Sequence, residues 1–409
     1  YRKAPGDLDA WLADPTHDAV LHAVPVEEAM GRILNIALND LPENCWAMLR
    51  TLAAFRMSAS YNALVGLHVG LTRPFESEAA LDRALTDLED RGLMGWDRKA
   101  NRYDLHPVVR GGVWDRMLGS ERNDVLNSLT DHFRAMPPDS RQISCLDDMT
   151  PAIELFSALA RLGHYDAAFE VLCNSRYEES LYRYCQGHDL LQLLRLLFPK
   201  GTSELPAMHE PHSQATACCM ISNAYLICAD PSSGEKAVRL QRQIQESQGM
   251  SSAQTETSIR LAWMLWQTGK LLEAQASLEI PILTARTAKN RALESRALDL
   301  LGVLLATRGL YADARRACER AEAISLNPRR NTTSYDYIAA SQVAIYEQDW
   351  QRAELWVEKA KDSANRRRDS DDQINAAVLL AMVRTGSDHH DAVTSLAEAL
   401  VLCRNENQL

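Results

Sequence analysis

The chain has 409 residues, 46% apolar and 24% charged, which suffices for two or three globular domains. Only 18 glycines and 15 prolines occur, so we expect a mostly α-helical protein. The formal net charge of −11 disfavours nucleic-acid binding unless a local basic patch opposes it. The longest apolar run, Ala376 to Val383, falls well short of the ~20 residues that span a bilayer. We therefore expect no membrane partner.

The nine cysteines show no CxxC motif and no zinc spacing, and they are scattered along apolar stretches. They indicate reduced, mostly buried thiols and a cytoplasmic protein without a metal site. The sequence begins at Tyr1 without a cleavable leader, so we expect no signal peptide and a chain that belongs to something longer.

Residues 1 to 118 show two patterns. Residues 1–40 hold two helical stretches with too little apolar surface for a core of their own. The next stretch predicts three helices, a hairpin and a further helix: Pro42 to Leu52, a helix after Ser58, Ser77 to Arg91, strands Leu93 to Trp96 and Arg102 to Leu105, and a helix from Pro107. This order predicts a winged helix-turn-helix.

From about Glu121 the pattern is helix upon helix, with an internal repeat. A six-residue pattern recurs: it begins with a small or polar residue, has an aromatic residue or leucine two places later, and has an alanine five places after its start. The last strong copies follow one another at nearly equal spacing. The copies are Gly163 to Ala168, Gly269 to Ala274, Gly309 to Ala314, Gln348 to Ala353 and, more weakly, Ser387 to Ala392. Each unit is predicted to be an antiparallel helix pair of tetratricopeptide type. Between Cys173 and Ser213 no repeat is assigned.

The predicted fold class is therefore all-α, with a winged helix carrying a small β-hairpin followed by a tetratricopeptide-like α-solenoid. The predicted domains are a helical remnant of a nucleotide-binding module at 1–40, a winged helix at 41–118, an irregular helical-repeat region at 119–212 and tetratricopeptide-like repeats at 213–409.

The order of these parts resembles the carboxyl half of STAND-class signalling ATPases, in which an NB-ARC nucleotide-binding module precedes a tetratricopeptide sensor. The resemblance rests on Leu41 to Phe55, on Leu81 to Trp96 and above all on the stretch Arg102-Tyr-Asp-Leu-His-Pro-Val-Val-Arg110. It implies that His106 faces the β-phosphate of bound ADP in the intact parent protein. The acid that usually follows this histidine in the family is replaced here by Pro107.

The chain contains no GxxxxGK[ST] motif, so it lacks the loop of backbone amides that cradles a triphosphate. We expect no ATP hydrolysis and no cofactor in this chain, with ADP or ATP bound by the parent. No catalytic constellation stands out either. For His106 the alternative to nucleotide contact is a cap or packing role at the start of a helix.

A winged helix also raises the possibility of DNA binding. Between Ser77 and Gly92, however, the sequence has five acidic residues and only two arginines. A helix with this net negative charge would repel phosphates in the major groove. We therefore expect no nucleic-acid partner and a packing role for this module.

Counting back from the repeat turns places several side chains where a concave groove is expected. They are Trp263, Trp266, Arg296, Asp299, Tyr335 and Tyr346. Two tryptophans three residues apart could anchor a protein or peptide partner. The alternative, that they form the core between repeats, is equally compatible with the sequence.

The sequence thus predicts the sensor and conformational-relay part of a STAND-type NTPase. Its partners would be a protein or peptide ligand and the nucleotide-binding module of the same protein, with oligomerisation only in the activated parent. One alternative is the regulatory half of a transcription activator with the same module order. Another is a plain tetratricopeptide scaffold.

Overall fold

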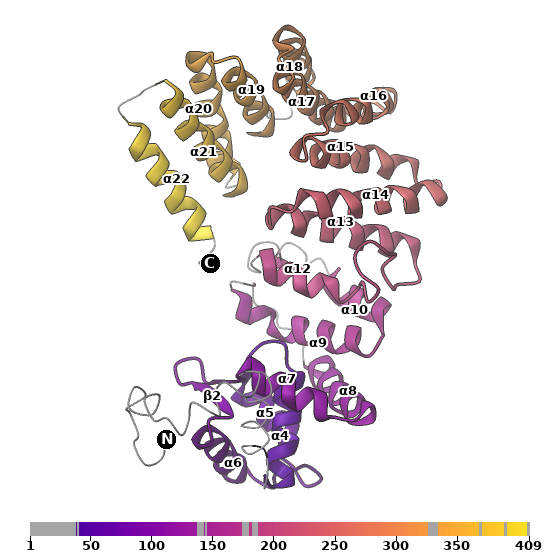
Figure 1. The fold of residues 1–409 in the computed structure, drawn as a ribbon, viewed down its shortest axis with the longest axis vertical. Helices are drawn as coiled ribbons and strands as arrows, with labels where there is room; N and C mark the ends of the chain where they lie inside the picture. The colour runs from indigo at the N-terminus through magenta and orange to yellow at the C-terminus, as the bar shows by residue number, and fades with distance from the viewer. Residues whose placement is uncertain are drawn as a thin grey trace, which may run out of the picture. The chain divides into compact units, whose positions relative to one another are not determined.

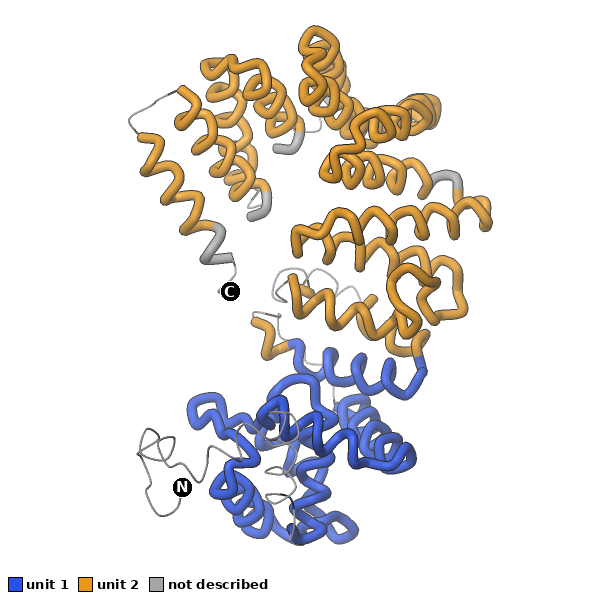
Figure 2. The backbone as a smooth tube through the Cα atoms, viewed as in Figure 1, with its two compact units in different colours: residues 1–142, 149–164 blue, residues 143–148, 165–409 orange. Residues whose placement is uncertain are grey.

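The computed structural model describes residues 38, 41–136, 143, 145–173, 180–181, 187–325, 334–367, 370–387 and 391–406. These residues are mostly helical (Figure 1), as the composition predicts. They fall into two compact units, shown in two colours in Figure 2. Unit 1 comprises residues 1–142 and 149–164, and unit 2 comprises residues 143–148 and 165–409. Apart from Leu38, the expected nucleotide-binding remnant lies outside the described residues.

Unit 1 contains three helices with a small sheet, followed by three further helices, of which the second is the longest. Its elements are α4 (Glu43–Ala54), β1 (Ala59–Ser60), α5 (Tyr61–His68), α6 (Glu78–Asp90), β2 (Met94–Asp97), β3 (Arg102–Leu105), α7 (Pro107–Arg116), α8 (Gly119–Ala135) and α9 (Thr150–Arg161). A short 3-10 helix, η1 (Leu146–Met149), precedes α9.

The sheet has the strand order β1-β3-β2, and both pairings are antiparallel. Tyr103 on the central strand lies opposite Ala59 on one side and Trp96 on the other. Helices α4, α5 and α6 pack with this sheet around one core, and the hairpin of β2 and β3 lies where the sequence predicts two strands. The two-residue strand β1 was not predicted, because two residues are too few to show an alternating pattern.

The helix starts follow from local chemistry. The Ser60 side chain accepts a hydrogen bond from the backbone N–H of Ala63, and Ser77 accepts one from Ala80, so serines cap the amino ends of α5 and α6. Leucines on one face of each helix fill a shared core, which also receives Phe133 from α8. The core therefore continues past residue 118, where the sequence placed a domain boundary.

Unit 2 consists of helices arranged largely in antiparallel pairs. They are α10 (Tyr165–Leu172), α12 (Gly187–Arg195), α13 (Pro211–Ile227), α14 (Pro231–Ser247), α15 (Ser251–Gln267), α16 (Leu271–Thr287), α17 (Arg291–Thr307), α18 (Tyr311–Ser325), α19 (Ser334–Tyr346), α20 (Trp350–Arg367), α21 (Ser370–Gly386) and α22 (Ala392–Glu406). From α13 to α18 the helices begin at a constant interval along the chain, as their first residues show.

One type of turn joins these helices. At Gly269 the backbone has φ 76°, its N–H donates to the Trp266 carbonyl, and the next N–H, from Lys270, donates to the Leu265 carbonyl. This Schellman pattern closes the carboxyl end of a helix through a left-handed residue. The same pair of bonds and a positive φ recur without glycine at Ala229, Lys289 and Gln348. A search of the sequence for glycine therefore does not find the turns that have another residue at this position.

The alanine five residues after each predicted turn packs as expected. Ala274, Ala314 and Ala353 are fully buried in the second helix of their pairs, where that helix passes close to the first. In the α13–α14 pair Gly234 takes this place, and a Cβ there would lie 3.4 Å from the Ser222 carbonyl oxygen. This pair lies in the predicted repeat region 213–409, but the short repeat motif was not found in it because its turn has alanine and its contact residue is glycine.

The unit thus has the all-α, tetratricopeptide-like organisation that the sequence predicts. Among the described residues, every helix is too short or too polar to traverse a lipid bilayer.

Candidate functional site

His106 stands at the amino end of α7, directly after the wing. Its side chain is exposed, and Nδ1 accepts a hydrogen bond of 3.3 Å from the backbone N–H of Val108. Pro107 occupies the first helical position, where its missing N–H costs nothing. Within this chain His106 therefore caps a helix, which is the alternative role that the sequence left open.

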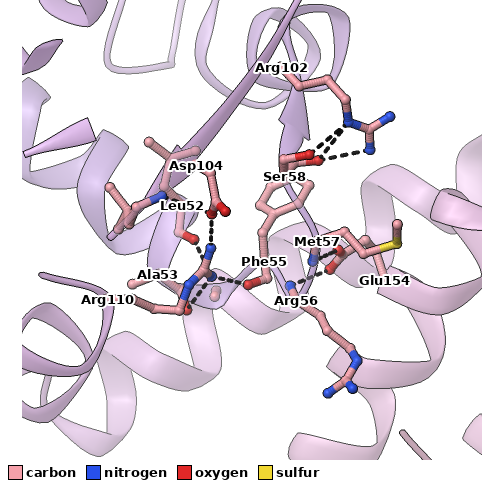
Figure 3. A network of polar contacts seen from close by, with 12 residues as sticks. Leu52, Ala53, Phe55, Arg56, Met57, Ser58, Arg102, Asp104, Arg110 and Glu154 are labelled. Atoms are coloured by element: carbon pink, nitrogen blue, oxygen red, sulfur yellow. Dashed lines mark hydrogen bonds and ion pairs between the residues drawn. The ribbon is translucent and has the colours of Figure 1, made fainter. Parts of the chain in front are cut away.

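Four residues further on, Arg110 closes the carboxyl end of α4. Its guanidinium donates to the carbonyl oxygens of Leu52, at 2.8 Å, and of Phe55, and it also pairs with the Asp104 carboxylate (Figure 3). The last carbonyls of a helix lack partners within the helix, and a cation there also complements the helix dipole. Arg110 therefore joins α4, β3 and α7.

Glu154 of α9 contacts the segment that connects α4 to β1. Its buried carboxylate accepts hydrogen bonds from the backbone N–H groups of Arg56, at 2.9 Å, and Met57, at 2.6 Å (Figure 3). Burial raises the pKa of Glu154 to about 7, although these two bonds and the charge of Arg110 act in the opposite direction. Ionisation of this carboxyl thus falls near neutral pH.

Two further arginines complete the network around the α4–β1 connection. Arg161 donates to the Ala54 carbonyl at 2.7 Å and lies 3.8 Å from the ring centre of Trp114. Arg102 donates to the Ser58 carbonyl at 2.8 Å and to the Thr150 hydroxyl at 3.1 Å. Sequence reasoning identified His106 but missed this network, because its partners are up to 107 residues apart.

The third helix of the predicted winged module, α6, carries the acidic surface that the sequence indicated. Asp82 accepts a 2.8 Å hydrogen bond from the Tyr61 hydroxyl, and Asp87 pairs with Arg91 at 2.9 Å. Glu78 and Asp90 are exposed. Phosphate binding at this face would bring like charges together.

In unit 2 the two tryptophans of α15 form an edge-on pair. Their ring centres are 5.0 Å apart at an interplanar angle of 61°. The indole N–H of Trp266 donates to the Thr307 hydroxyl of α17 at 3.1 Å, and its ring packs against the apolar clusters of both repeats. Trp266 is thus part of the packing between repeats, the alternative that the sequence left open.

Trp263 is half-buried against the core of its own repeat. Its indole Nε1 is buried and has no hydrogen-bond acceptor among the described residues. A buried N–H without an acceptor is costly, and tryptophan usually finds one. Of the two tryptophans, Trp263 is therefore the one with a polar atom left for a ligand.

The other groove candidates differ in access. Arg296 is about half exposed, and its guanidinium lies 3.8 Å from the Glu256 carboxylate. Tyr346 is 39% exposed at the end of α19. The side chain of Tyr335 lies outside the described residues.

The structure corrects the assignment of Asp299 to an open groove. Asp299 is only 1% exposed and lies between the repeats, where its carboxyl shares a hydrogen bond with Asp336 of α19. Burial and this neighbouring carboxyl raise the pKa of Asp299 well above its usual value. Counting from the repeat turn predicted the position of Asp299 along its helix. It could not predict the burial of Asp299, because Asp336 belongs to the next repeat.

Within the described residues, no group of three or more histidine, cysteine, aspartate or glutamate side chains could hold a metal ion. The described cysteines are free thiols, and burial raises the pKa of Cys218 to about 12.

No family model and no curated protein sequence matches the chain. Among solved structures it is similar to a signal transduction ATPase with numerous domains (STAND) from Pyrococcus horikoshii that has a tetratricopeptide repeat sensor, with 14% identity and a TM-score of 0.31 over 92% of this chain and 65% of that one. The chain thus spans less than two thirds of that protein.

Two further solved structures overlap with parts of the chain. BtubC from P. vanneervenii has 19% identity and a TM-score of 0.35 over 61% of this chain and 92% of that one. A tetratricopeptide repeat protein from Parabacteroides merdae has 15% identity and a TM-score of 0.32 over 64% and 93%. At such TM-scores these likenesses carry no weight for function, and the repeat organisation rests on the geometry of the chain itself.

Proposed function

We propose that this chain recognises a protein or peptide segment through its helical repeats and relays that recognition within a STAND-type NTPase. The observation that carries the recognition part is Trp263. Its ring is held against Trp266, which is itself fixed by Thr307, and its buried N–H lacks an acceptor among the described residues. A peptide carbonyl would supply that acceptor if binding uncovers the N–H, while the accessible part of the rigid ring would supply apolar contact.

The relay part is supported by the shared core of α4, α5, α6 and the sheet and by the network around the α4–β1 connection. Arg110 and Glu154 hold this connection to α7 and α9, so displacement of one element would be resisted by the others. A ligand favours the active state of the parent only to the extent that it binds that state better.

In this scheme the chain itself neither hydrolyses nucleotide nor binds DNA, and it works with the nucleotide-binding module of a cytoplasmic parent. Titration with ADP or ATP should then show no binding tighter than ~1 mM. The acidic face of α6 supports the expectation for DNA.

The recognition surface can be tested by selecting binders from a random peptide library on the chain and measuring their dissociation constants calorimetrically. We expect Trp263→Ala to weaken the selected peptides about tenfold or more, as for an aromatic hot spot. Trp263→Phe keeps an aromatic ring but removes the N–H and part of the apolar area of the indole, so it should weaken them less than alanine does. Binding unchanged in both variants would refute the assignment.

Tyr346 and Tyr311 offer a matched pair of controls, because both are 39% exposed. Tyr346 ends the first helix of a repeat, whereas Tyr311 begins the second helix of the preceding one. Tyr346→Ala should reduce peptide affinity and Tyr311→Ala should not. Equal effects of the two variants would show that the selected peptides do not use the face built by first helices.

The proposed role of His106 can be separated from its cap in the intact parent. His106→Ala removes both the imidazole and the cap, whereas His106→Asn restores a good cap without the imidazole. If the imidazole contacts ADP and holds the resting state, both variants should raise basal activity. Activation by alanine alone would assign the effect to the cap and contradict nucleotide contact.

A further inference from the structure

A small cavity lies inside unit 2 between helices α17, α18, α19 and α20. Its volume is about 20 Å³, which has room for one water-sized group. Four carboxyl side chains and one guanidinium line it, together with the ring of Trp356. The charged lining residues are Asp299, Glu319, Glu322, Asp336 and Arg352.

Asp299 and Asp336 form the inner part of this lining. Both are buried, and the hydroxyl of Ser295 donates to the Asp336 carboxylate at 3.2 Å. Two adjacent buried carboxyls cannot both ionise easily. Burial and the neighbouring carboxyl accordingly raise the pKa of Asp299 well above its usual value.

One polar atom of this pair is left without a partner. The second carboxyl oxygen of Asp299, Oδ2, is buried and finds no donor among the described residues, although Asp299 lines the cavity. An unpaired buried oxygen costs free energy that a donor inside the cavity would recover. The indole Nε1 of Trp356, which also lines the cavity, is buried without an acceptor among the described residues, so a water molecule, which both donates and accepts, is the competing occupant. For Asp299 the missing component is a hydrogen-bond donor of about the size of one water molecule.

The charges around the cavity favour a cationic donor. Arg352 is the only cationic side chain in the described lining, and its guanidinium lies 3.7 Å from the carboxylate of Glu347. Lys359 lies outside this lining, 4.1 Å from the centre of the Trp356 ring. Carboxyls thus outnumber cations, with Glu319 exposed and Glu322 half-buried on α18.

We propose that this cavity binds a primary ammonium group, which is the head of a lysine side chain from a partner or of a free alkylamine. Its N–H donors match the unpaired oxygen of Asp299 and the Asp336 carboxylate, and its charge complements the acidic lining. A metal ion fits less well, because no three histidine, cysteine or acidic side chains in the described parts converge for one.

Binding of the ammonium displaces the proton that the two aspartates share. Asp299 releases it to solvent and becomes a carboxylate that faces a cation. The affinity for the ammonium group therefore increases as pH rises, as long as the amine itself stays protonated. The site is independent of the peptide surface at Trp263, so either proposal can fail without the other.

Calorimetric titration of the chain with n-butylammonium chloride at about pH 8 tests the site. We expect saturable binding with proton release, and Asp299→Asn should weaken it about tenfold or more through loss of a charged hydrogen bond. Asp313→Asn is the matched control, because Asp313 is a half-exposed acid on α18 outside the cavity lining. If Asp299→Asn does not fold, Glu322→Gln at the same cavity replaces it.

The competing cations make the result decisive. Potassium and tetramethylammonium, which have no N–H donors, should not compete with n-butylammonium. Three results would overturn the proposal: equal competition by either cation, equal binding by Asp299→Asn, or no saturable binding by the natural chain. The last of these would mean that the cavity holds water only. A capped lysine tripeptide compared with its norleucine analogue distinguishes the sources, since tighter binding of the lysine peptide than of n-butylammonium indicates a protein partner.

Discussion

The two units are held together in different ways. In unit 1 the key polar contacts join residues far apart in sequence, such as Glu154 with Arg56, 98 residues away, around one shared core. In unit 2 the extensive contacts run between consecutive helices and between first helices of successive pairs, and separate apolar clusters follow one another along the chain. Unit 1 should therefore unfold as a whole, whereas the stability of unit 2 is a sum of neighbouring terms.

The largest expected effect concerns the carboxylate in the middle of the unit 1 network. Glu154→Leu removes the buried carboxylate that accepts from the partly buried N–H groups of Arg56 and Met57, and it should cost unit 1 about 4 kcal/mol. Hydrogen exchange of amides in α4 and α9 should accelerate together, while α13 to α18 remain protected.

Glu154→Gln is the matched control, because it keeps one acceptor oxygen and should cost less. Similar acceleration of exchange in both units would contradict the contrast between them.

The next effect is a pH dependence confined to unit 1. Burial, aided by the charge of Arg73, lowers the pKa of His68 to about 4 from 6.5. The unfolded chain thus binds this proton more tightly, so the contribution of His68 to stability is full above pH 6.5 and is lost as pH falls through 4. The loss should be about 2 kcal/mol at pH ~5 and about 3 kcal/mol in total.

Denaturation of the natural chain and of His68→Phe, which cannot titrate, should be compared between pH ~7 and pH ~5. The variant should lose about 2 kcal/mol less over this range. An identical loss in both proteins would assign the acid sensitivity to other groups.

A smaller effect tests close packing in unit 2. A Cβ at Gly302 of α17 would lie 2.6 Å from the Cys318 sulfur and 3.2 Å from the Ala314 carbonyl oxygen. Gly302→Ala should therefore destabilise that repeat by about 2 kcal/mol through overpacking. The loss of protection should appear in α17 and α18 first and should fade along the neighbouring repeats.

In unit 1 a glycine-to-alanine substitution should instead increase stability. Gly111 lies inside α7, and a Cβ there would meet nothing within 4 Å. Gly111→Ala should raise the melting temperature, because alanine favours the helix by up to about 1 kcal/mol. A stabilising Gly302→Ala would show that the two helices of this pair are not in tight contact.

The sequence predicted local features of both units well and nonlocal ones poorly. The turns at Gly269 and Gly309 were predicted because glycine marks a positive φ. The equivalent turn at Ala229 carries no such mark, and the short repeat motif was therefore not found in the α13–α14 pair. The burial of Asp299 depends on Asp336 of the next repeat. Likewise, the role of Glu154 depends on a connection 98 residues away, which no local pattern reveals.

The smallest effect concerns those turns without glycine. Lys289 adopts φ 54° between α16 and α17, which strains any residue with a Cβ. Lys289→Gly should stabilise the repeats by about 0.5 kcal/mol, a gain limited by the greater freedom of glycine in the unfolded chain. Gly269→Ala at the equivalent turn should be destabilising by a similar amount. Thermal melts of the two variants should move in opposite directions, and a shift of the same sign would show that the turns are not equivalent.

The regular spacing of α13 to α18 also restricts how the gene for this chain can grow or shrink. These helices begin at a constant interval and alternate between first and second members of a pair. A tandem duplication of Ser251 to Asn290 would add one whole pair in phase, with each buried alanine again facing a first helix. A duplication of Ser251 to Lys270 alone would place a first helix, with its tryptophans, at a position that the second helix of a pair normally occupies. In-frame recombination within this stretch therefore preserves the fold only in steps of two helices.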